Sequence, residues 1–272
     1  MPVEYRVLKT SRAIDCHTHV FSASAPAVAG ARYRPAYAAR LESLQAAWHA
    51  NGITHGVIVQ PSFFGTDNHE MLAAIAADRG SLRGVAVLDP AAADDEIARL
   101  DAGGVVALRL NLKGCEDYRR YADGEWKDLY RRIGARGWHL EVYMDAGRLP
   151  DIVPALDGGD CAVVFDHFGN PGVDEARADA TFDALATLSA GRPVHVKLSG
   201  PYRLGGADRR LLAARWMDIT GPAGLVWGSD WPWTAFEDRN DYRRLREDLD
   251  RWIGAALAPA ILWDNAARLY RF

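Results

Sequence analysis

Eight short runs of apolar and β-branched residues recur along the 272-residue chain, and segments with helical spacing separate them. The runs lie at residues 13–17, 55–60, 82–89, 104–111, 138–144, 161–167, 193–199 and 224–230. Most are nearly continuous in apolar character, which is typical of parallel strands covered by helices. Eight strand–helix repeats in a chain of this length predict a closed (β/α)8 TIM barrel.

The segments between the runs carry helical patterns. Residues 37–52 place Leu41, Leu44 and Trp48 on one stripe and end at a glycine. Residues 66–80 begin with Asp67 and Glu70 at the spacing of a capping box. Further helices are expected at 94–102, 124–137, 174–189, 207–219, 241–256 and 259–269.

A doubly wound open sheet is the competing fold. Such sheets usually carry a glycine-rich turn after the first strand, whereas here the first run continues into "HTHVF". No linker, repeat or change in composition divides the chain. We therefore expect one barrel domain over residues 1–272.

The bulk composition excludes several classes of partner. The formal net charge is −4, and no run approaches the roughly 18 apolar residues of a membrane helix. Three separated cysteines suit a reducing compartment better than a disulfide framework. We expect a cytoplasmic protein that binds neither nucleic acid nor membrane, and the oligomeric state stays open.

Polar residues gather where the predicted strands end. In a barrel, the functional side chains lie at the C-terminal ends of strands and share the inward parity. Alternation predicts that Asp15, His17 and His19 face inward on the first strand, and that Val163, Phe165 and His167 do so on the sixth. The other predicted inward polar groups are Gln60, Arg109, Glu141, Tyr143, Lys197, Ser199 and Asp230.

Each of these residues also has a structural interpretation. Asp230 could cap a turn, Arg109 could pair with an acid such as Asp15 or Glu141, and Cys16 is expected to pack outward. The functional interpretation is favoured because three histidines and one aspartate occur together at predicted strand ends.

The motifs "DCHTHVF", "VIVQPSFFGTDN", "LRLNLKG", "FDHFGNP", "VKLSGPYR" and "WGSDWPWT" resemble the amidohydrolase superfamily. The similarity is to the branch that contains 2-pyrone-4,6-dicarboxylate lactonase and related sugar and muconolactone lactonases, and it spans residues 13 to 234. It implies a hydrolase that opens a lactone. By this resemblance, Asp230 is the base that activates water, and His17, His19 and His167 polarise the lactone carbonyl.

The same four side chains could instead hold a divalent ion such as zinc. Metal-dependent members of the superfamily add a lysine or glutamate on strand four, or a histidine on strand five. Here those strands end in Arg109 and Tyr143, a fixed cation and a poor substitute for imidazole. We therefore expect no metal cofactor, with His17, His19, His167 and Asp230 as the ligands if one binds.

The substrate is expected to be a small anionic lactone. Arg109 and Arg203 are the predicted carboxylate ligands. Further predicted substrate-binding residues are Gln60, Ser62, Tyr143 and Lys197. Trp231 and Trp233 are expected to wall off the pocket and to raise the basicity of Asp230. The rival functions are a metal-dependent decarboxylase of an aromatic or unsaturated acid, and a barrel that binds an anion without turnover.

Overall fold

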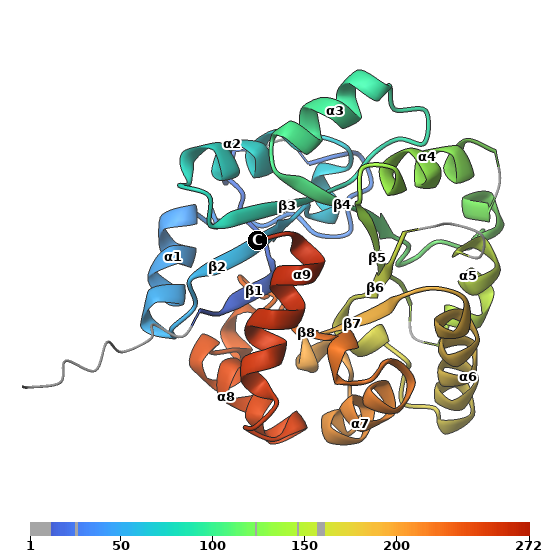
Figure 1. The fold of residues 1–272 in the computed structure, drawn as a ribbon. Helices are drawn as coiled ribbons and strands as arrows, with labels where there is room; N and C mark the ends of the chain where they lie inside the picture. The colour runs from blue at the N-terminus through green and yellow to red at the C-terminus, as the bar shows by residue number, and fades with distance from the viewer. Residues whose placement is uncertain (1–11, 25–26, 123, 146, 157–160) are drawn as a thin grey trace, which may run out of the picture.

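The computed structural model describes residues 12–24, 27–122, 124–145, 147–156 and 161–272, so part of the predicted domain, including residues 1–11, lies outside it. Among the described residues, eight parallel strands form one sheet in sequence order, ringed by helices (Figure 1). The strands are β1 (Ile14–Thr18), β2 (His55–Val59), β3 (Leu82–Ala86), β4 (Val105–Asn111), β5 (His139–Tyr143), β6 (Val163–Phe165), β7 (Val194–Leu198) and β8 (Leu225–Trp227). The prediction of a (β/α)8 barrel is confirmed.

The helices follow the strands in alternation. They are α1 (Leu41–Ala50), α2 (His69–Ala77), α3 (Asp94–Ala102), α4 (Gly124–Gly134), α5 (Leu149–Leu156), α6 (Glu175–Gly191), α7 (Arg209–Thr220), α8 (Tyr242–Ile253) and α9 (Ala266–Tyr270). Sequence analysis missed α5, where Pro150 and Pro154 obscure the pattern. The predicted capping box is wrong, because Glu70 instead accepts hydrogen bonds from the backbone N–H and hydroxyl of Ser22.

The sheet is nearly closed between β1 and β8. A parallel bridge joins Thr18 to Trp231. The amide of Asp230 donates to the carbonyl of His17 at 2.8 Å, and the amide of His19 donates to the carbonyl of Trp231 at 2.9 Å. The seam of the barrel therefore fixes the backbone of His17 in β1, and of His19 just after it, against that of residues 230 and 231.

The inward parity of β1 differs from the prediction. Cys16 packs inside the barrel with Val57 and Val226, whereas Asp15 accepts hydrogen bonds from Trp48 of α1 and Tyr242 of α8. The pairing register of β1 with β2 shifts between Asp15 and Thr18. Such an irregularity breaks strict alternation, so Cys16 does not pack outward as expected.

The parity predicted for β6 is also wrong. Val163 and Phe165 belong to the outer core, and the ring of Phe165 lies 5.9 Å from that of Trp216 on α7. Asp166 and His167 both enter the barrel mouth, because His167 has a positive φ of 54° that turns the chain there. The parities predicted for β4, β5, β7 and β8 agree with the packing of their apolar residues.

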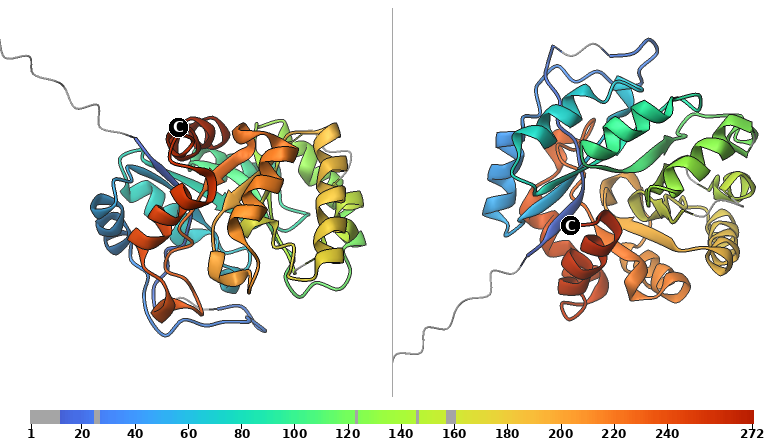
Figure 2. Two further views of the ribbon diagram at one scale, coloured as in Figure 1. Left: turned by 90° about the horizontal axis from the view of Figure 1, so that it is seen from below. Right: turned by 45° about the horizontal axis from the view of Figure 1, so that its top comes forward.

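The two ends of the barrel are built differently. The segments after β1 and β8 extend from the end opposite to the C-terminus (Figure 2, left). At the other end, Tyr270 of α9 packs on Cys16 and Val226 and closes the interior. No helix in the described part of the chain is long and apolar enough to cross a membrane.

Candidate active site

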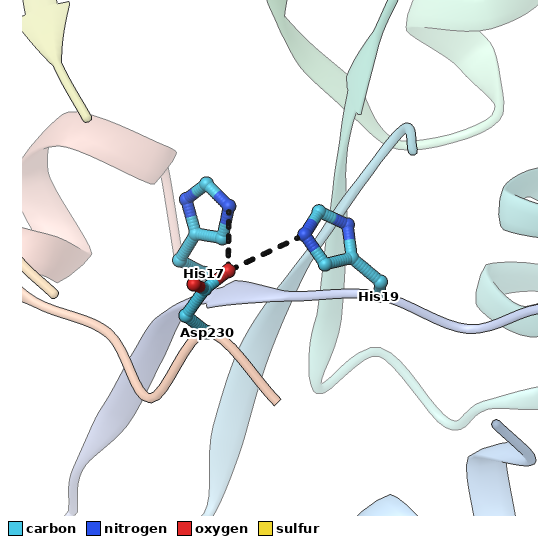
Figure 3. A group of neighbouring side chains, drawn as sticks. All are labelled: His17, His19 and Asp230. Atoms are coloured by element: carbon cyan, nitrogen blue, oxygen red, sulfur yellow. Dashed lines mark ion pairs between the residues drawn. The ribbon is translucent and has the colours of Figure 1, made fainter. Parts of the chain in front are cut away.

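His17, His19 and Asp230 meet at the end of the barrel where the strands end (Figure 3). The Nε2 atoms of His17 and His19 lie 3.6 Å and 3.5 Å from Oδ1 of Asp230. Nε2 of His167 approaches Oδ2 of the same carboxylate at 3.9 Å. The structure thus brings together the four residues that the sequence singled out, and all four are buried.

The backbone around these residues is constrained. A Cβ atom at Gly228 would lie 2.6 Å from Cβ of His17, so β8 can approach β1 this closely only with glycine at that position. Asp230 and His167 have positive φ angles of 59° and 54°. Non-glycine residues in this region cost about 1–3 kcal/mol each and cluster at functional sites.

Asp230 is held by two neighbouring side chains. The hydroxyl of Tyr202 and Nε of Arg203 donate to its Oδ2 at 2.6 Å and 2.7 Å. Burial alone would raise the pKa of Asp230, but Arg203 and the nearby histidines hold it well below its usual range. The expected gain in basicity is therefore contradicted: in this state Asp230 is an ionised and weakly basic carboxylate. These contacts also go beyond what a turn cap would require.

The contacts of the Nδ1 atoms of His19 and His17 bear on where each ring carries its proton. Nδ1 of His19 lies 2.7 Å from the carbonyl of Val59, which can only accept, so the neutral ring presents a lone pair at Nε2. Nδ1 of His17 lies 3.2 Å from Nζ of Lys197. An ammonium can only donate, so a hydrogen bond from Lys197 places the proton of neutral His17 on Nε2. Oδ1 of Asp166 lies equally near, 3.2 Å from the same Nδ1 atom, and a hydrogen bond to it would place the proton on Nδ1 instead. Burial and the charge of Lys197 lower the pKa of His17 to about 4, which keeps this ring neutral near pH 7.

A buried ionic network lies beneath His17. Lys197 is fully buried and contacts Glu141 at 2.5 Å and Asp166 at 3.2 Å. Burial would raise the pKa of Asp166, but Lys197, His17 and Arg109 hold it well below its usual range. Sequence analysis missed Asp166 as a site residue because it was assigned the outward parity, although it stands in the quoted "FDHFGNP" motif.

An inner cavity of about 280 Å³ is lined by His19, His167 and Asp230, whereas His17 is fully buried and does not line it. Its lining includes Ser62, Arg109, Tyr143 and Arg203 from the predicted substrate-binding set, and also Arg32, Tyr33, Phe63 and Phe236. The aromatic wall therefore comes from these rings and Tyr143; Trp231 and Trp233 do not line the cavity, and Trp233 donates instead to the carbonyl of Ser229.

Two predicted substrate-binding residues do not line this cavity. Lys197 lies in the ionic network below His17. The side-chain amide of Gln60 donates to the carbonyls of Gly65 and Asp67, so it holds the loop after β2. Arg109 does pair with an acid, as its structural interpretation predicted, but the acid is Asp166, at 3.1 Å, and not Asp15 or Glu141. Arg109 also lines the cavity.

Among the residues that the structure describes, two groups of buried side chains could hold a metal ion. One consists of His17, His19 and Asp230, and the other of His17, Asp166 and His167. Within each group the candidate ligand atoms lie within 4.8 Å of one another.

Comparison with known proteins gives a consistent set of relatives. A 2-pyrone-4,6-dicarboxylate hydrolase of Comamonas testosteroni is 29% identical over 95% of this chain and 90% of its own length. A Pseudomonas putida structure named as a candidate 2-pyrone-4,6-dicarboxylic acid hydrolase is 36% identical, with a TM-score of 0.85 over 95% of this chain and 97% of that one. An Acinetobacter baumannii structure given a similar name, with citric acid bound, is 29% identical, with a TM-score of 0.87 over 96% and 99% of the two chains.

Other curated relatives are lactone hydrolases and a lactone isomerase. Structures that share only the fold include a zinc-bound amidohydrolase of Burkholderia multivorans and two decarboxylases. The sequence pattern of the amidohydrolase family matches residues 14–272, and we conclude that the chain belongs to this family.

Proposed function

We propose that this protein is a hydrolase that opens an anionic lactone without a metal cofactor. The observation that carries the proposal is the convergence of three buried histidines on one buried aspartate beside Arg109 and Arg203. Cations above a water-activating carboxylate suit an ester that itself carries negative charge. The curated relatives include several lactone hydrolases, which supports this reaction class.

The proposed reaction uses the tautomer of His17 that accepts a hydrogen bond from Lys197. Asp230 Oδ1 and the lone pair on His19 Nε2 accept hydrogen bonds from a water, whose oxygen attacks the lactone carbonyl while Asp230 takes a proton. The Nε2–H of His17 donates to the oxyanion that forms; one such donor contributes about 3–4 kcal/mol. The bond from the carbonyl carbon to the ring oxygen then breaks, and Asp230 returns the proton to that oxygen. The products carry one carboxyl and one hydroxyl group.

Substrate binding restores the basicity that Arg203 suppresses. Arg203 donates from Nε to Asp230, and its guanidinium also faces the inner cavity. A substrate carboxylate there competes with Asp230 for the positive charge. Weakening that contact raises the pKa of Asp230. The base is therefore strongest when an anionic substrate is bound.

The ligand set fits a metal ion only in part. An ion at His17, His19 and Asp230 would act as a Lewis acid on the carbonyl and lower the pKa of a water. His19 and Asp230 offer lone pairs, whereas in the tautomer that accepts a hydrogen bond from Lys197, Nε2 of His17 carries a proton where a ligand needs a lone pair. The cations Arg203 and Lys197 stand within 3.2 Å of two of these three side chains. These contacts favour the metal-free reaction over metal-dependent decarboxylation.

A hydrolysis screen over carboxylated lactones and pyrones, run with and without EDTA, tests the proposal. We expect ring opening that survives exhaustive chelation, and Asp230→Asn should abolish turnover while retaining ligand binding. Complete loss of activity with EDTA, restored by zinc, would overturn the metal-free reaction. Release of CO2 from an aromatic acid by the metal-loaded protein would identify the decarboxylase instead.

A further inference from the structure

A second, larger cavity adjoins the inner one and has no task in the reaction above. This outer cavity has a volume of about 550 Å³ and lies over the ends of β2, β3 and β4. The two cavities share five lining residues: Arg32, Ser62, Arg109, Asn111 and Lys113. A ligand in one cavity therefore lies against the same wall as a ligand in the other.

The charge of the outer cavity is mostly positive. Arg32, Arg109, Lys113 and Arg120 line it, whereas Asp89 is its single acidic residue among those described. Oδ1 of Asp89 already accepts from the amide of Ala91. The whole chain is acidic, with a net charge of −4, so this concentration of cations is a local feature.

Three of these cations are held by neutral oxygen atoms. Arg32 donates to the amide oxygen of Asn111 at 3.0 Å, and Lys113 donates to the hydroxyl of Tyr143 at 3.3 Å. Arg120 donates to the hydroxyl of Tyr121 at 2.7 Å. Within the described ranges, the ion pairs found involve none of Arg32, Lys113 and Arg120. Their side chains are positioned while their charges stay available to an anion.

The far wall of the outer cavity is aromatic and apolar. The rings of Tyr121 and Trp126 lie 4.7 Å apart, and Leu88 and Leu110 add aliphatic surface. Arg120 stands beside Tyr121, with its guanidinium carbon 4.8 Å from the ring centroid. The wall therefore suits an apolar or unsaturated chain that ends in an anionic group.

We propose that the substrate spans both cavities and is a lactone with a second anionic group beyond an apolar spacer. This inference rests on the proposed function and specifies its substrate class. The inner cavity has a volume of about 280 Å³. Because pockets for drug-sized ligands start near ~300 Å³, this cavity holds the reacting ring and leaves the rest of the substrate to the outer cavity. The spacer lies against Trp126, and Arg120 receives the distal anion. Arg120 is thus a specificity-determining residue that does not touch the reacting atoms.

Binding of α,ω-dicarboxylates of increasing length, from succinate to sebacate, tests this arrangement. Titration calorimetry of the full chain would compare each diacid with the monocarboxylate of the same length. We expect one length range in which the diacid binds about tenfold more tightly, as one charge-assisted contact would give. Arg120→Gln should remove that advantage and leave the monocarboxylates unchanged.

Arg119→Gln is the matched control, because Arg119 is the exposed neighbour of Arg120 in the same short helix and lines neither cavity. A diacid advantage that does not depend on length, or that Arg119→Gln removes equally, would overturn the inference. This assay needs no turnover. If no lactone is hydrolysed but the length effect depends on Arg120, the proposed function fails and the outer site stands. If simple lactones are hydrolysed but Arg120→Gln changes no diacid affinity, the outer site fails alone.

Discussion

Gly228 is where the packing of β8 against β1 can be tested directly. In Gly228→Ala, the new methyl group would lie 2.6 Å from Cβ, 2.8 Å from the backbone N and 3.2 Å from Cα of His17. Carbon atoms pack at about 3.5–4.0 Å, so the two strands must separate by roughly 1 Å. No rotamer relieves the contact, because two of the three atoms belong to the backbone of β1.

The expected effect on activity is large and the effect on folding moderate. Displacing a reacting group by about 1 Å costs about 100-fold in rate, so kcat for a carboxylated lactone should fall by that order. Overpacking destabilises by about 1–3 kcal/mol, which corresponds to a Tm lower by about 2–12 °C. Activity and thermal unfolding would be measured on the same preparation.

Gly206→Ala is the control, because a Cβ atom at Gly206 meets nothing within 4 Å. That variant should keep wild-type kcat and Tm. If Gly228→Ala retains kcat within about threefold of wild type, the close approach of β8 to β1 does not set the geometry of His17 and Asp230. The reasoning would then be refuted, whatever the Tm.

Four further substitutions test the charges of the site. Arg203→Gln should move the acid limb of kcat/KM to higher pH, because Arg203 holds the pKa of Asp230 low; an unmoved limb would mean that Asp230 is not the titrating base. Lys197→Met should destabilise the fold by about 3–5 kcal/mol in denaturant unfolding, since it leaves the buried Glu141 without its lysine cation. Adding Glu141→Gln should recover part of that loss, and no recovery would contradict the pairing. Arg109→Met should raise KM for an anionic lactone, and an unchanged KM would remove Arg109 from the binding site.

The pH dependence of stability has a definite sign at Asp230. Its folded-state pKa lies well below the ordinary value of 3.8. Its contribution to the free energy of unfolding is therefore fully present above about pH 4, and it is lost as the pH falls through the folded-state pKa. Urea unfolding of wild type and Asp230→Asn between pH 3 and 7 checks this, because the difference between the two should shrink towards the acid end.

The order of the elements could be predicted because the strands are buried on both faces and several of the helices between them end at glycines, such as Gly103 after α3 and Gly221 after α7. All eight predicted strands are present. The predicted runs mostly extend past the strands at their C-terminal ends, as with 82–89 against Leu82–Ala86 for β3. Buried residues continue there, many of them polar, such as Gln60, Asp166 and Ser199. The predicted runs therefore mark burial, and they do not mark where the strand hydrogen bonds stop.

The arrangement inside the site could be predicted only where strand alternation is regular. Strand alternation placed Arg109 and Tyr143 in the mouth, but it failed at β6. There Asp166 separates the three strand residues from the positive φ of His167. A backbone turn of this kind has no residue signature in a histidine. The position of Arg203 near the barrel mouth was likewise predictable, because it follows the seventh strand directly. Its hydrogen bond to Asp230 was not, because that bond depends on how the loops after β7 and β8 meet.

The charges of the mouth divide by their place in the fold. Asp166, at the end of β6, is paired with Arg109 of β4. Asp230, at the end of β8, is paired with Arg203 from the loop after β7. The cations without an acidic partner, such as Arg120, come from the long segments beyond the strands. Loops tolerate change that a paired and buried strand end does not. Substitutions in residues 113–120 should therefore alter which anion is bound. They should leave unchanged the pH at which kcat/KM falls on the acid side, because that pH is set by Asp230.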